Sequence, residues 1–132
     1  MNIQTYWIIF STAFRRQLTY RAATLAGLFT NFFFGILRAY LMIALYSEQL
    51  VVDGFSLDAA ITFTGLSQAF IGFLSIFHWW EVAQSINSGD VSSELLKPIN
   101  YFRYWMFVDL GRATASLLTR GFPILIAYYF LI

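Results

Sequence analysis

Residues 22–46 have the sequence AATLAGLFTNFFFGILRAYLMIALY, in which Arg38 is the only charged residue. A helix of these 25 residues is about 37 Å long at 1.5 Å per residue, enough to cross a hydrocarbon core of about 30 Å with some tilt. The stretch therefore predicts a first membrane span. A second apolar stretch at residues 59–80 predicts a second span, after a short exposed loop at residues 47–57 that has no lysine or arginine.

The composition of the whole chain agrees with a membrane protein. Hydrophobic residues make up 59% of the chain and charged residues 11%, whereas soluble domains have roughly 25% charged residues. A net charge of +1 gives no basic field for nucleic acid. One histidine and no cysteine argue against a metal site. Since no nucleophile–base pair or phosphate-binding loop is present either, we expect no enzymatic activity and no cofactor.

Residues 1–21 predict an amphipathic helix that lies in the membrane interface. One side of this helix is aromatic and apolar, whereas polar and basic residues gather on the other: Gln4, Thr5, Ser11, Thr12, Arg15, Arg16 and Thr19. The alternative is a simple polar lead-in to the first span.

Basic residues near the span ends predict the orientation of the chain. Arg15, Arg16 and Arg21 precede the first span, and basic residues also follow the second, whereas the loop between the spans is acidic. We therefore expect a multi-pass protein of the cell membrane, with a cytoplasmic N-terminus and a cytoplasmic loop at residues 81–103.

Residues 104–132 return to the membrane, and two interpretations of this region stay open. One long helix enters the bilayer near Leu117, or an interfacial helix ends near Gly121 and a span begins at Pro123, a residue that is tolerated in a first turn. The apolar run from Ile124 stops without a polar flank. This favours a truncated third span and a chain that is the front part of a longer protein.

Small residues recur every four positions in both predicted spans. They are Ala23, Gly27, Asn31, Gly35 and Ala39 in the first span, and Thr62, Gly65, Ala69 and Gly72 in the second. Such stripes let helix backbones approach closely. Asn31 and Gln68 serve this packing or line a substrate path.

Charged residues inside the apolar regions also need an explanation. Arg38 faces a partner acid or an aqueous path, or it lies towards the outer end of the span and extends to the head groups. Asp109 and Arg112 are three residues apart on one helix face, where they can form a structural ion pair.

The cytoplasmic loop has a clear local pattern. Residues 87–89, Asn-Ser-Gly, are typical of a turn. Asp90 is a good N-cap, whose carboxylate we expect to accept from the N–H of Ser92 or Ser93. Because Pro98 disfavours helix just before it, the pattern predicts a helix of about two turns from Val91 to Leu96.

These residues resemble the membrane permeases of type-2 ATP-binding-cassette transporters, mostly bacterial exporters. The resemblance rests on Ile86-x-x-Gly89-Asp90-Val91-x-x-x-Leu95-Leu96-Lys97-Pro98, followed by Asp109-Leu110-Gly111-Arg112 and Arg120-Gly121-x-Pro123. In that family the loop after the second span carries a coupling helix that docks on the ATPase subunit. The resemblance therefore implies docking by Gly89, Asp90, Glu94, Leu95, Lys97 and Pro98.

The resemblance also implies the partners and the class of function. We expect an all-α membrane protein, apparently the N-terminal half of a permease, that pairs with a second permease subunit as a homo- or heterodimer. A separate ATPase subunit would bind and hydrolyse the ATP that drives export. The alternative is a small helical membrane protein that scaffolds or anchors partners without transport.

Overall fold

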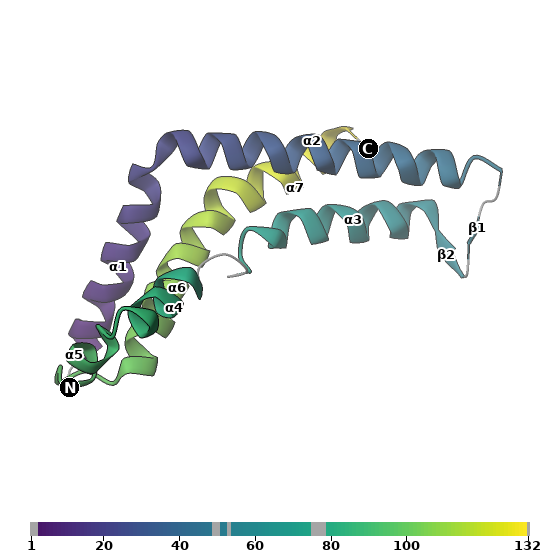
Figure 1. Cartoon of the computed structure of the whole chain (residues 1–132). Coiled ribbons are helices and arrows are strands. Elements are labelled where there is room, and N and C mark those ends of the chain that lie inside the picture. The colour runs from purple at the N-terminus through teal and green to yellow at the C-terminus, as the bar shows by residue number, and fades with distance from the viewer. Residues whose placement is uncertain (1–2, 49–50, 53, 75–78, 132) are drawn as a thin grey trace. The chain divides into compact units, whose positions relative to one another are not determined.

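The computed structural model describes residues 3–48, 51–52, 54–74 and 79–131, and it is mostly helical (Figure 1). The chain divides into two compact units. Unit 1 combines Met1–Thr19 with Leu74–Ala115, and unit 2 combines Tyr20–Phe73 with Ser116–Ile132.

Unit 1 contains α1 (Ile3–Thr19), α4 (Trp79–Asn87), α5 (Val91–Leu95) and α6, which runs Tyr101–Ser116 and ends one residue beyond the unit. Helices α1 and α6 pack closely. The rings of Tyr6 and Phe107 are stacked with centroids 4.8 Å apart. Gly111 of α6 admits the backbone of α1, because a Cβ at this position would collide with the carbonyl oxygen of Phe10.

Unit 2 contains α2 (Arg21–Leu45), β1 (Val51–Val52), β2 (Phe55–Ser56), α3 (Leu57–Ile71), the π-helix η1 (Leu117–Gly121) and α7 (Phe122–Leu131). Within this unit, α2 and α3 lie side by side and α7 contacts both (Figure 1). Among the described residues, α2 is the one helix long and apolar enough to cross a membrane, with a mean hydropathy of 1.7.

Helix α3 is shorter than the second span that the sequence predicts at residues 59–80. It has 15 residues, or about 22 Å at 1.5 Å per residue, against a hydrocarbon core of about 30 Å. The helix ends in a turn in which the N–H of Phe73 donates to the carbonyl of Phe70. Residues 75–78 of the predicted span lie outside the described residues.

The short loop that the sequence predicts at residues 47–57 contains a small hairpin. In the loop after α2, Val51 pairs with Ser56 and Val52 with Phe55 in an antiparallel hairpin. Gly54 has a φ of +84°, a conformation that glycine adopts without a steric penalty and that hairpin turns require. Ser56 then caps α3 by accepting from the N–H of Ala59 at 3.3 Å.

In the C-terminal region, α6, η1 and α7 follow one another without an intervening loop. In η1 the N–H of Phe122 donates to the carbonyl of Leu117, five residues earlier. Pro123 follows Phe122 directly, and a proline has no N–H to donate to the carbonyl of the residue four positions earlier. The change of helix type therefore coincides with the residues at which the sequence left two interpretations open.

Several hydroxyl groups in these helices bond to the carbonyl four residues earlier. The donors are Thr30 in α2, Thr64 and Ser67 in α3, and Thr114 in α6, each at 2.8 Å. Each of these hydroxyls is therefore satisfied inside its own helix.

Candidate functional site

A glycine and a serine determine the conformation of the turn between α4 and α5. Gly89 has a φ of +80°, which favours glycine. Asp90 stands at the N-cap of α5, but its carboxylate makes no capping bond. It accepts instead from the hydroxyl of Ser88 at 2.6 Å. The predicted bond to the N–H of Ser92 or Ser93 is therefore wrong, because these two N–H groups donate to the carbonyls of Gly89 and Asp90 instead.

Glu94 braces the short helix against α4. Its carboxylate accepts from the hydroxyl of Ser85 at 3.1 Å, and Ser85 itself is buried. The hydroxyls of Ser92 and Ser93 bond to the carbonyls of Gly89 and Asp90, both at 2.8 Å. The predicted docking residue Glu94 is thus engaged within unit 1, and α5 is held by side chains at both ends.

The outer end of α5 exposes apolar side chains. Leu95 is 63% exposed and Leu96 is 86% exposed. The next two residues, Lys97 and Pro98, are exposed as well. We call Leu95, Leu96, Lys97 and Pro98 the α5 edge. Two adjacent exposed leucines beside a cation are suited to binding a protein partner with an apolar pocket.

A second brace in unit 1 joins the N-terminal helix to α4. Arg16 and Glu81 form an ion pair with an N–O distance of 2.9 Å. After the α5 edge, Asn100 caps α6, since its amide oxygen accepts from the N–H of Arg103 at 3.0 Å. The turn and α5 are therefore framed by elements that are themselves held by polar contacts.

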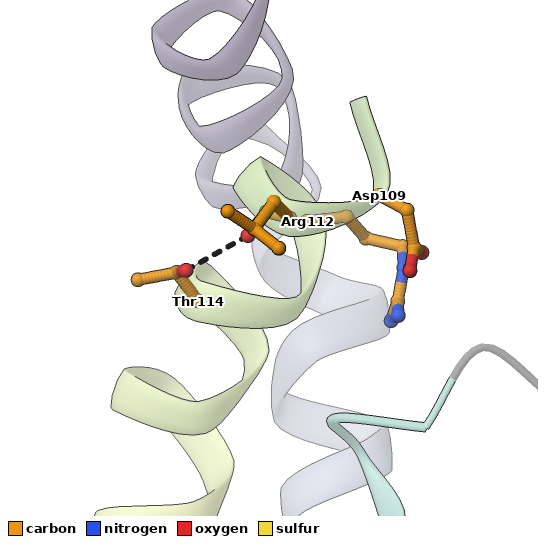
Figure 2. Close-up of polar contacts among 4 residues, drawn as sticks. Asp109, Arg112 and Thr114 are labelled. Carbon is orange, nitrogen blue, oxygen red and sulfur yellow. Dashed lines mark hydrogen bonds and ion pairs between the residues drawn. The ribbon is translucent and has the colours of Figure 1, made fainter. Parts of the chain in front are cut away.

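Asp109 and Arg112 form an ion pair on α6, with Nε and Oδ1 2.9 Å apart. Figure 2 shows the two side chains reaching towards each other, while Thr114 bonds within the helix. The Arg112 side chain is 10% exposed and the Asp109 side chain 41% exposed. The spacing of three residues thus gives the contact that the sequence predicts.

The predicted pathway residues fall in three different environments of unit 2. Gln68 is 2% exposed and lies against Gly35. Asn31 is half-buried and Arg38 is exposed. Separately, a surface groove of about 320 Å³ lies between α3 and α7, lined by Asp58, Ile61, Thr62, Leu66, Leu125, Tyr128 and Tyr129. Among the described residues, no group of histidine and acidic side chains could hold a metal ion.

Sequence reasoning missed what fills the small-residue stripes. Arg120 donates to the carbonyl of Ala23 at 3.1 Å, and the hydroxyl of Tyr128 donates to the carbonyl of Gly35 at 2.5 Å. A Cβ at Gly65 would lie 2.6 Å from the Tyr128 ring. The stripes therefore receive large side chains from η1 and α7. The small size of Gly35 and Gly65 is the sequence signal that could have suggested such an inserted side chain.

Comparison with known proteins identifies the family. A family model described as ABC-2 family transporter protein matches residues 25–132, which is most of the chain. No curated protein and no solved structure matches the chain. The matched range includes most of α2, the turn before α5, the α5 edge and the Asp109–Arg112 pair. This chain therefore belongs to the ABC-2 family of transporter proteins.

Proposed function

We propose that the chain is a membrane-spanning permease component of an ATP-driven exporter, and that a separate ATPase subunit supplies the hydrolysis. In this proposal α2 is the first span, residues 59–80 form the second, and α7 contributes to a third. Residues 1–21 lie in the interface and residues 81–103 face the cytoplasm. A second permease subunit, identical or related, completes the pathway.

The α5 edge carries this proposal. Leu95 and Leu96 are exposed on a short helix that is held in place by Ser85 and Glu94. Exposed apolar residues on a mobile loop would be costly to order at an interface, whereas a braced helix is already ordered. The family match supports an ATPase as the partner.

The braces suggest how movement of the partner would reach the membrane. Displacement of α5 would pull on α4 through the Ser85–Glu94 bond, and α4 would in turn pull on α1 through the Arg16–Glu81 pair. The proposed roles of the other residues follow from this. Gly89 and Asp90 shape the turn, Glu94 positions the edge, and Leu95, Lys97 and Pro98 contact the ATPase. Asn31, Arg38 and Gln68 stay candidates for the pathway or for helix packing.

Co-purification tests the proposal directly. The tagged protein, with any further permease chain encoded beside it, is co-expressed with a candidate ATP-binding-cassette ATPase of the same cell and reconstituted into nanodiscs. We expect the ATPase to be retained, and its hydrolysis rate to change when the permease is present. Loss of the ATPase during purification, with the membrane protein intact, would contradict the proposal and favour the scaffold alternative.

Orientation gives a second test, which is simple because the chain has no cysteine. A single cysteine at Ser92 should react with a membrane-impermeant maleimide only from the cytoplasmic side, and one at Val51 only from outside. Both side chains are exposed. The reason is the distribution of lysine and arginine around the spans. Labelling of Val51→Cys from the cytoplasm would overturn the topology.

A further inference from the structure

Arg120 of η1 inserts into a gap on α2. Its Nη2 donates to the carbonyl oxygen of Ala23 at 3.1 Å. A Cβ built at Gly27 would lie 2.5 Å from both the guanidinium carbon and Nη1 of Arg120. The guanidinium therefore occupies the volume that any side chain at position 27 would fill. We call the surface formed by Ala23 and Gly27 the Gly27 notch.

The segment that carries Arg120 is a π-helix, a geometry that occurs mostly as single turns and frequently at functional sites. Contacts with two neighbouring helices hold it. Arg120 binds the Gly27 notch on α2, and Gly121 lies against α3, where a Cβ would be 2.9 Å from the carbonyl oxygen of Ala69. The π turn is thus clamped between two helices of unit 2.

The orientation of α7 about its own axis depends on the π turn of η1. Tyr128 of α7 fits against Gly35 and Gly65 and donates its hydroxyl to the carbonyl of Gly35. Its neighbour Tyr129 is 84% exposed. Conversion of one π turn to an α turn would rotate everything after it by about one residue, or roughly 100°. Tyr128 would then move to the face that Tyr129 now occupies.

We propose that η1 is a two-state switch and that Arg120, seated in the Gly27 notch, holds it in the π state. When the guanidinium leaves the notch, η1 relaxes to α-helix and α7 rotates, which withdraws Tyr128 from Gly35 and Gly65. Two discrete packings of one helix are the kind of bistable element that conformational changes use. The proposal goes beyond permease function and rests only on contacts within unit 2.

Gly27→Ala provides a test in which the sign of the effect decides. In an ordinary helix interior, alanine is more favourable than glycine. In the wild-type background we expect Gly27→Ala to lower the thermal unfolding midpoint of the full chain in detergent micelles, because the added methyl expels Arg120. In an Arg120→Ala background, the same substitution should raise the midpoint. An equal change in both backgrounds would overturn the proposal.

Gly72→Ala is the matched control. A Cβ there would lie 3.8 Å from Cδ of Arg120, an ordinary contact, so its effect should be the same in both backgrounds. If the Arg120→Ala variant does not fold, a direct measurement of the rotation of α7 still tests the proposal. Spin labels at Leu45→Cys and Ile126→Cys, both exposed positions, report the distance between α2 and α7. Gly27→Ala should replace the wild-type distance population with a second one, and an unchanged distribution would refute the switch.

Discussion

Replacement of both Leu95 and Leu96 by aspartate is expected to abolish retention of the ATPase subunit while the protein still inserts into the membrane. The two leucines lie outside the predicted spans and are exposed, so the change adds little to the free energy of insertion. At an interface, a charge placed on a buried apolar anchor costs about 2–5 kcal/mol. That corresponds to a loss of affinity of roughly 30-fold to several thousand-fold.

Recovery of the ATPase with each variant, at matched expression, measures this effect. Val51→Asp is the control, since it makes the same kind of change at a residue that is 55% exposed in the loop between α2 and α3. It should leave recovery unchanged. Wild-type recovery with the double aspartate variant would mean that the α5 edge is not the docking surface.

Substitutions of Glu94 distinguish two roles of this residue, namely bracing α5 and binding the ATPase through its negative charge. The residue braces α5 through its bond from Ser85, and an amide oxygen can accept the same bond. Glu94→Gln should therefore keep the ATPase, whereas Glu94→Arg should lose it. If Glu94→Gln also loses the ATPase, the negative charge itself binds the partner.

Asp109→Asn should destabilise the protein more than Glu81→Gln. The two acids are similarly exposed, with side chains at 41% and 36%, but their arginine partners differ, since Arg112 is 10% exposed and Arg16 58% exposed. Loss of a partner from a fully buried pair costs about 3–5 kcal/mol, and exposure of Asp109 reduces this to about 1–2 kcal/mol. An exposed pair such as Arg16–Glu81 contributes about 0–1 kcal/mol.

Chemical denaturation of both variants in detergent micelles measures the difference in the free energy of unfolding. Because asparagine and glutamine match the shapes of the acids they replace, the comparison isolates the charge. Equal losses in the two variants would show that burial of Arg112 does not make its partner more important.

The local parts of the fold could be predicted from the sequence. The turn at Gly89 and the proline at Pro98 bound a helix found at Val91–Leu95, and the apolar run at residues 22–46 matches α2 closely. These features depend on neighbouring residues. The bond of Asp90 was predicted wrongly because the N–H groups of Ser92 and Ser93 donate to backbone carbonyls, and the hydroxyl of Ser88 donates to the carboxylate.

The long-range parts could not be predicted in the same way. The stripes indicated that something packs against Gly27 and Gly35, but the contacts come from Arg120 and Tyr128, more than 90 positions away in sequence. No periodicity connects such residues. The π turn was equally hidden, because its contacts are made with two other helices, α2 and α3. The hairpin at Val51–Ser56 depends on pairs too short to produce a pattern.

The hydroxyl bonds inside the helices affect how the translocation machinery would sort these segments. A hydropathy scale assigns each threonine or serine a fixed polarity, as if its hydroxyl faced the lipid without a partner. In α3, Thr64 and Ser67 already donate to carbonyls of their own helix. Since an unsatisfied polar group is what makes transfer into hydrocarbon unfavourable, the surface that α3 would offer to lipid during biosynthesis is more apolar than its residue composition suggests.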